Sequence, residues 1–166
     1  MILEKYFFPD KKYNSINEID VIELKNMGIN FVILDIDNTL VPYTMAQPDE
    51  NALNFLKKLL ENGISYCFVS NNSSERVSSF NEEIGAQFFA RGAKPLLFGI
   101  NRAMREHGAK RENTALIGDQ VFTDVCGAKR AGVYSILVDP IKECTSAFFR
   151  FKRYFERKII SKYLSE

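Results

Sequence analysis

Four aspartates in two separated segments of the chain have the side-chain chemistry of a divalent-cation site. Asp35 and Asp37 are two positions apart, and Asp119 and Asp124 form a second pair much later in the chain. Carboxylates that are brought together repel one another, and a bound cation removes that repulsion. Because ligands that are all oxygen favour Mg²⁺ over zinc or copper, the four aspartates predict a magnesium site. The single histidine, His107, excludes a zinc site built on two histidines.

Three further polar side chains are suited to hold a phosphate group. Ser70 and Asn71 follow an apolar run, and Lys94 lies in a later loop. A hydroxyl, an amide and an ammonium group can each donate to phosphoryl oxygens. Next to a cation, one of two neighbouring carboxylates could attack phosphorus and form an aspartyl-phosphate, while the other protonates the leaving oxygen. The set predicts phosphoryl transfer, and the absence of both GxxxxGKS/T and GxGxxG argues against an NTPase or a dinucleotide-binding enzyme.

Apolar runs that alternate with amphipathic segments indicate the elements that must position these groups. We expect strands at residues 31–34, 64–69, 87–90, 114–117 and 134–138. Helices are expected around them, at residues 16–27, 48–62, 73–85, 95–108 and 121–131. Such alternation predicts a doubly wound α/β fold of three layers, with a Rossmann-like parallel sheet of about five strands and right-handed crossovers. The composition, with 46% hydrophobic and 26% charged residues and a net charge of +1, is that of an ordinary globular domain.

The candidate residues all follow the ends of predicted strands. In sequence order the four loops carry Asp35 and Asp37, Ser70 and Asn71, Lys94, and Asp119 and Asp124. Ligands bind beyond the carboxyl ends of the strands in open parallel sheets, where these loops meet. We therefore expect the acids, the hydroxyl, the amide and the lysine to share one edge of the sheet.

Four short segments resemble the signature motifs of haloacid-dehalogenase-type phosphatases. They are residues 35–40 (DIDNTL), 70–72 (SNN), 91–95 (RGAKP) and 118–124 (GDQVFTD), and they occur in the order that the family requires. The resemblance covers nearly the whole chain and implies the haloacid-dehalogenase fold and a magnesium-dependent reaction. An aspartate at position 37 favours a phosphatase or a mutase over a dehalogenase.

The resemblance also implies a role for each candidate residue. Asp35 would be the nucleophile and Asp37 the general acid and base. The metal ligands would be Asp35, Asp37 through its carbonyl oxygen, Asp119 and Asp124. The phosphate ligands would be Ser70, Asn71 and Lys94.

The gaps between the motifs leave no room for a cap domain. The segments between Asp37 and Ser70 and between Ser70 and Lys94 are each filled by one predicted helix and one predicted strand. We therefore expect a single phosphatase domain over residues 1–166 with no cap. A site without a cap is open, which suits a phosphate presented by a lipid headgroup at a membrane, a protein or a nucleic acid.

The last part of the chain combines aromatic and basic residues. A helix expected at about 145–164 places Phe148, Phe151 and Phe155 at helical spacing and interleaves them with arginines. Such a helix can lie in an anionic membrane interface, or it can pack its aromatic residues onto the sheet and leave its charges in water. No apolar window reaches the roughly 18 residues of a membrane span, and no secretory signal is recognised. We expect a cytoplasmic protein, with peripheral binding to the inner face of the membrane under the first of the two interpretations.

The short opening before Pro9 and the form of the last motif resemble the capless, YqeG-type branch of the family (subfamily IIIA). That branch is similar to phosphatidylglycerophosphate phosphatases, and the resemblance implies removal of the terminal phosphate of this anionic phospholipid. Two alternatives stay open. One is a phosphatase for a soluble sugar phosphate, nucleotide or phosphoprotein, and the other is a nucleic-acid or ribosome-associated binding protein with a vestigial site. Because the candidate residues are all present, no nucleic-acid partner is expected.

Overall fold

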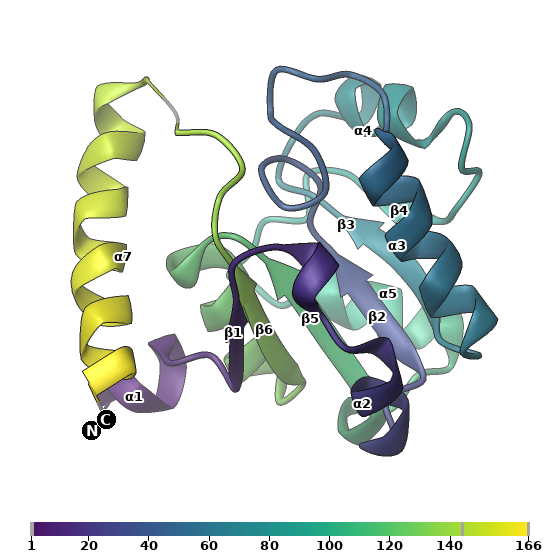
Figure 1. Ribbon diagram of the computed structural model, residues 1–166, viewed down its shortest axis with the longest axis horizontal. Coiled ribbons are helices and arrows are strands. Elements are labelled where there is room, and N and C mark those ends of the chain that lie inside the picture. The colour runs from purple at the N-terminus through teal and green to yellow at the C-terminus, as the bar shows by residue number, and fades with distance from the viewer. Residues whose placement is uncertain (1, 144, 166) are drawn as a thin grey trace.

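A sheet of six parallel strands forms the centre of the molecule and positions the candidate residues (Figure 1). The computed structural model describes residues 2–143 and 145–165. The strands lie in the order β1-β6-β5-β2-β3-β4, and their bounds are β1 (Lys11–Tyr13), β2 (Phe31–Leu34), β3 (Ser65–Val69), β4 (Phe88–Phe89), β5 (Thr114–Gly118) and β6 (Tyr134–Val138). The doubly wound parallel α/β fold predicted from the sequence is confirmed.

One strand, β1, was not predicted, so the sheet has six strands where about five were expected. Its sequence, Lys11-Lys12-Tyr13, has no apolar run, and all three residues are only half-buried. β1 is an edge strand that pairs with β6 alone. Edge strands often carry lysine because it blocks pairing with another chain, and this removes the pattern by which a buried strand is recognised.

Within residues 2–143 and 145–165, seven α-helices surround the sheet. They are α1 (Ile2–Phe7), α2 (Val21–Asn26), α3 (Glu50–Glu61), α4 (Ser74–Asn81), α5 (Phe98–His107), α6 (Cys126–Ala131) and α7 (Ala147–Ser165), with short 3₁₀ turns at η1 (Ile16–Glu18) and η2 (Arg111–Asn113) and a π turn at η3 (Val121–Val125). Two hydrophobic clusters define the layers: one joins α2, α3 and α4 to the sheet, and the other joins α5 and α6 to its opposite face. In β2, Val32 and Leu34 belong to the first cluster and Phe31 and Ile33 to the second. Both faces are therefore covered, as in three-layer α/β folds.

Three predicted helices differ in their bounds. The helix predicted at 16–27 is broken, because Asp20 leaves the helical conformation and caps α2 by accepting from the main-chain N–H groups of Ile22 and Glu23. The helix predicted at 121–131 begins with the π turn η3. The helix predicted to start at Pro95 starts at Phe98, since residues 93–96 form a turn closed by a hydrogen bond from Leu96 N to the carbonyl of residue 93.

The described residues contain no separate cap domain, as predicted. β2 leads to α3 through a loop at residues 35–49, β3 leads almost directly to α4, and β4 is followed by α5. None of the helices in the described ranges combines the length and the apolar character that a membrane span requires. Among the described residues, the carboxyl edge of the sheet is therefore bordered by loops, by η3, by the start of α4 and by α7.

The C-terminal helix α7 stands along the β1 and β6 side of the molecule, with its end beside α1 (Figure 1). A small hydrophobic cluster attaches it: Ile159 packs with Val121, Val125 and Leu137. Ile159 and Glu156 are the buried residues of α7, whereas Phe148 is 71% exposed. One stripe of the helix thus packs on the body, as the second interpretation of the tail expects, while most of its aromatic residues face outward instead of packing on the sheet.

Candidate active site

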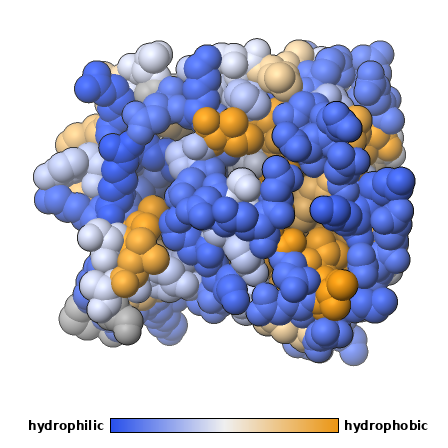
Figure 2. Space-filling model, in the orientation of Figure 1, coloured by the Kyte–Doolittle hydropathy of each residue, from blue (hydrophilic) through white to orange (hydrophobic). Residues whose placement is uncertain are grey.

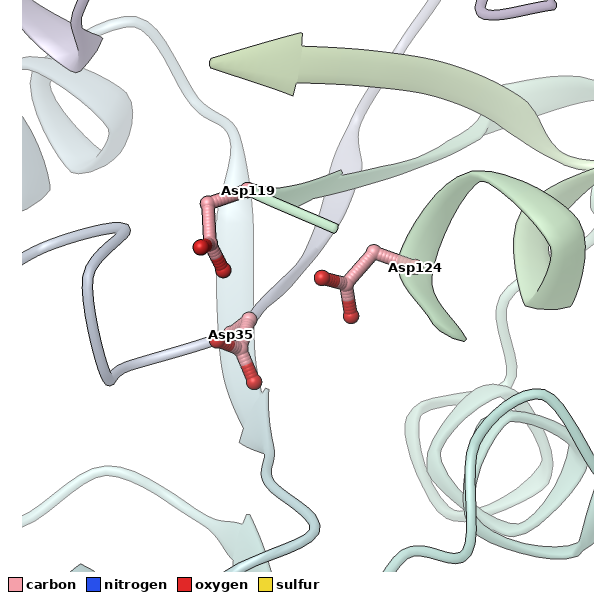
Figure 3. Close-up of side chains that lie close together, drawn as sticks. All are labelled: Asp35, Asp119 and Asp124. Carbon is pink, nitrogen blue, oxygen red and sulfur yellow. The ribbon is translucent and has the colours of Figure 1, made fainter. Parts of the chain in front are cut away.

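Three of the four predicted metal-binding aspartates come together at the carboxyl edge of the sheet. Asp35 follows β2, Asp119 follows β5, and Asp124 lies in η3. One carboxylate oxygen from each lies within 4.8 Å of the others, and Figure 3 shows the three side chains pointing toward one another. Asp35 is 7% exposed and the other two are each 1% exposed. Because β2 and β5 are neighbours in the sheet, carboxylates that are distant in the sequence lie in one buried cluster.

Lys94 lies inside this cluster. Its Nζ donates a hydrogen bond of 2.7 Å to Oδ1 of Asp35 and also lies 2.7 Å from Oδ1 of Asp124. The loop that carries Lys94 is held by Asn71, whose side-chain amide donates to the carbonyl of Lys94 and accepts from its N–H, both at 2.8 Å. Ser70 is buried beside them, and its Oγ accepts from the N–H of Asn72 at 3.1 Å. Asn71 thus positions the lysine. The Ser70 hydroxyl accepts in this hydrogen bond, so its own hydrogen is available for a bound ligand.

Gly118 has a local role that the sequence pattern did not reveal. A Cβ atom at this position would lie 2.3 Å from Cγ of Asp124, which is closer than real carbon atoms approach. The N–H of Gln120 then holds Oδ2 of Asp124 at 3.0 Å. The missing side chain of Gly118 is what allows the carboxylate of Asp124 to reach the cluster.

Asp37 lies apart from the three clustered carboxylates. Its Oδ1 accepts from Nε and Nη2 of Arg76 at 3.1 and 2.7 Å, and its Oδ2 accepts from Nδ2 of Asn72 at 3.0 Å. Arg76 also donates to the carbonyls of Met45 and Ala46, so it ties the loop after β2 to α4. The sequence reasoning missed Arg76. It lies in the first turn of α4, and no sequence signal distinguishes it from the other arginines of the chain.

Arg153 connects α7 to the carboxylate cluster. One of its guanidinium nitrogens donates to the carbonyl of Asp119 at 2.6 Å, and the other pairs with the carboxylate of the same residue. Arg153 also pairs with the buried Glu156 at 3.0 Å, and Glu156 accepts from the N–H of Phe122 at 3.1 Å. The sequence predicted Arg153 only as part of a basic helix face. Its contact with Asp119 arises from the packing of α7 against η3.

Burial dominates the electrostatics of the cluster. It raises the pKa of Asp35 to about 8; Lys94 opposes this, and the neighbouring Asp124 and Asp119 add to it. Burial also raises the pKa of Asp119 to about 6, against the effect of Arg153. Burial alone would lower the pKa of Lys94, but Asp124 and Asp35 together raise it above its ordinary value. Without a cation, the cluster therefore resists full ionisation.

The donor set fits a divalent cation. When all three buried carboxylates are ionised, they carry one negative charge more than Lys94 and Arg153 together can balance. Oδ1 of Asp124 has no hydrogen-bond partner of suitable geometry among the described residues, although the ammonium of Lys94 is near. A hard cation with oxygen ligands would satisfy that atom and neutralise the excess charge.

The metal-free protein is expected to lose stability as the pH rises from about 5.5 to about 8. The folded chain keeps a proton on Asp35 in this range, whereas the unfolded chain has released it near the ordinary pKa of 3.8. Unfolding therefore releases a proton, and a higher pH favours the unfolded state by an amount on the order of 2 kcal/mol. Asp119 acts in the same direction up to about pH 6. Urea unfolding with EDTA across this range measures the effect, and a free energy of unfolding that rises with pH would contradict it.

Comparison with known proteins agrees with the fold. The family model described as "Haloacid dehalogenase-like hydrolase" matches residues 7–138. "Probable phosphatase YqeG" of Bacillus subtilis (strain 168) is 36% identical over 160 residues, which cover 96% of this chain and 93% of that protein. "Phosphatidylglycerophosphate phosphatase 1, chloroplastic/mitochondrial" of Arabidopsis thaliana is 23% identical; 96% of this chain is covered, but only 49% of the plant protein.

Solved structures of low sequence identity share the fold. An uncharacterized protein from Listeria monocytogenes serotype 4b has a TM-score of 0.59 at 20% identity, with 72% of this chain and 83% of that chain covered. A Had-superfamily hydrolase from Ehrlichia chaffeensis has a TM-score of 0.57 at 17% identity, with 80% and 98% covered. The chain belongs to the haloacid dehalogenase-like hydrolase family. Within that family it is a phosphatase, similar over nearly its whole length to the YqeG protein of Bacillus.

Proposed function

We propose that this phosphatase is magnesium-dependent, acts through an aspartyl-phosphate on Asp35, and removes the terminal phosphate of phosphatidylglycerophosphate. The observation that carries the proposal is the position of Asp35, which lies against Lys94 and the buried aspartates while α7 borders the same edge of the sheet. A nucleophile, a phosphate-binding cation and an acidic metal site are thereby combined with a basic, aromatic helix.

The chemistry is divided between two aspartates of the loop after β2, and an arginine of α4 supports one of them. The Asp35 carboxylate attacks phosphorus, and the bond from phosphorus to the leaving oxygen breaks as Asp37 gives that oxygen a proton. Asp37 then takes a proton from the water that hydrolyses the aspartyl-phosphate, which restores both carboxyl groups. Arg76 holds Asp37 in place for both steps through its two hydrogen bonds.

The remaining polar groups bind the phosphate and the metal. Lys94 and the Ser70 hydroxyl would donate to phosphoryl oxygens, and Asn71 would act through its main-chain N–H because its amide is bonded to Lys94. Mg²⁺ would be held by the carboxylates of Asp35, Asp119 and Asp124 and by the carbonyl of Asp37. Its chemical contribution is to neutralise charge on the phosphoryl oxygens.

The exposed aromatic residues of α7 support a lipid substrate. Phe148 is 71%, Phe151 65% and Tyr154 54% exposed, and basic residues of the same helix alternate with them. On the face drawn in Figure 2, hydrophobic residues lie in separate small patches among hydrophilic ones. The exposed side of α7 suits local contact with a membrane interface, where aromatic and basic side chains are favoured. The similarity to the plant phosphatidylglycerophosphate phosphatase supports phosphatidylglycerophosphate as the substrate.

Phosphate release from defined substrates tests the proposal. Purified protein with Mg²⁺ is expected to hydrolyse phosphatidylglycerophosphate in mixed micelles with a kcat/KM at least about tenfold above that for sugar phosphates, nucleotides and phosphopeptides, and EDTA should abolish the reaction. Preference for a soluble ester would reject the lipid substrate and keep the phosphatase mechanism. Full activity in EDTA that does not change when Mg²⁺ is added would reject the metal requirement.

A further inference from the structure

A pocket of about 740 Å³ lies between α7 and the loop that follows β6. Figure 1 shows that loop rising from β6 toward the start of α7. Asp119 lines the pocket and also belongs to the carboxylate cluster, so the pocket opens next to the candidate active site. The mechanism above uses none of this space. A substrate with its phosphorus at Asp35 could extend into it.

The charges that line the pocket leave one cation unpaired. Each acid has a cationic partner, in the pairs Asp119–Arg153, Asp139–Lys12, Glu143–Arg157 and Glu156–Arg153. Arg150 also lines the pocket, and its guanidinium has no carboxylate partner among the residues that the structure describes. It lies one helical turn before Arg153, on the same side of α7. The pocket therefore offers an exposed guanidinium without a carboxylate partner in the described chain, one helical turn from Arg153, which itself contacts Asp119.

Aromatic rings line the same pocket. Phe151 and Tyr154 line it and are largely exposed, and each ring packs edge-on against Phe155. Guanidinium groups bind phosphate oxygens through two parallel hydrogen bonds, and aromatic rings favour the boundary between water and acyl chains. An unpaired cation beside exposed aromatic rings matches a ligand with an anionic group attached to a lipid.

We propose that this pocket binds the internal phosphodiester of the lipid substrate through Arg150 while the terminal phosphate lies at Asp35. The inference rests on the proposed lipid substrate and adds how that substrate is selected. Phosphatidylglycerophosphate carries two phosphates joined by a glycerol unit, so it can fill both positions. A soluble monoester with a single phosphate, such as p-nitrophenyl phosphate, and phosphatidic acid can each fill only the position at Asp35.

The test compares Arg150→Gln with Lys158→Gln. Both substitutions remove one positive charge from α7, but Lys158 does not line the pocket; it lies over the ring of Tyr154 instead. Turnover is measured on phosphatidylglycerophosphate and on p-nitrophenyl phosphate. In addition, short-chain phosphatidylglycerol, which retains the phosphodiester without a terminal phosphate, is used to inhibit hydrolysis of p-nitrophenyl phosphate.

Arg150→Gln is expected to lower kcat/KM for the lipid at least tenfold more than for p-nitrophenyl phosphate, and to weaken inhibition by phosphatidylglycerol at least tenfold. Lys158→Gln should change both measurements by less than threefold. Equal losses for the two variants, with the wild type active on the lipid, would overturn the pocket and leave the proposed function standing. A wild type that hydrolyses p-nitrophenyl phosphate but neither hydrolyses nor is inhibited by the lipids would overturn both.

Discussion

Asp35→Asn is expected to lower the rate of phosphate release at least about a thousandfold while the protein stays folded. Asparagine has nearly the same shape as aspartate and keeps an oxygen that can accept from Lys94, as Oδ1 of Asp35 does at 2.7 Å. Its amide cannot attack phosphorus. Because ionisation of Asp35 is costly in this buried position, the metal-free variant should be at least as stable as the wild type at pH 8.

Steady-state kinetics and urea unfolding, each with and without Mg²⁺, check this prediction. Asp20→Asn is the matched control, because Asp20 caps α2 and takes no part in the candidate site, and asparagine caps helices equally well. The control should keep wild-type activity and stability. A rate for Asp35→Asn within tenfold of the wild type would exclude Asp35 as the nucleophile. A fall in metal-free stability at pH 8 would contradict the cost assigned to its buried charge.

The central part of the fold was predictable because burial on both faces leaves a strong pattern in the sequence. β2 consists of four consecutive buried apolar residues, and β5 and β6 follow the same rule. β1 was not predictable, since an edge strand of two lysines and a tyrosine resembles a loop. Helix bounds failed where a single polar contact decides them, as at Asp20, and where a loop is held from elsewhere, as Asn71 holds the loop before α5.

The candidate site was predictable where its residues follow strands. Asp35, Ser70 and Asp119 lie next to the ends of β2, β3 and β5, and the topology of a parallel sheet brings those ends together. Arg76 and Arg153 were not predictable, because they lie on helices among many other arginines and lysines. Only the packing of α4 and α7 brings their guanidinium groups to Asp37 and Asp119. Charged helix residues that reach a site from outside the sheet leave no periodic signal in the sequence.

Lys94→Met should destabilise the metal-free protein by about 3 kcal/mol, and Mg²⁺ should restore most of the loss. Lys94 is 4% exposed and lies 2.7 Å from carboxylate oxygens of both Asp35 and Asp124. Methionine fills a similar volume but leaves these buried carboxylates without their cation. A divalent ion bound to the same carboxylates replaces the lost charge, so the deficit should shrink as Mg²⁺ is added. Turnover should stay low even then, since phosphate has lost a donor.

Urea unfolding with EDTA and with saturating Mg²⁺ separates this effect from ordinary loss of packing. Lys11→Met is the matched control: Lys11 pairs with Glu23 at 3.2 Å, but both side chains are about half exposed. Such surface pairs contribute less than about 1 kcal/mol, so the control should change little and should not respond to Mg²⁺. If Lys94→Met is destabilised equally in EDTA and in Mg²⁺, the lysine stabilises the fold by packing, and the carboxylate cluster is not a metal site. A deficit that disappears only with Mg²⁺ identifies Lys94 and the cation as alternative partners of the same buried charges.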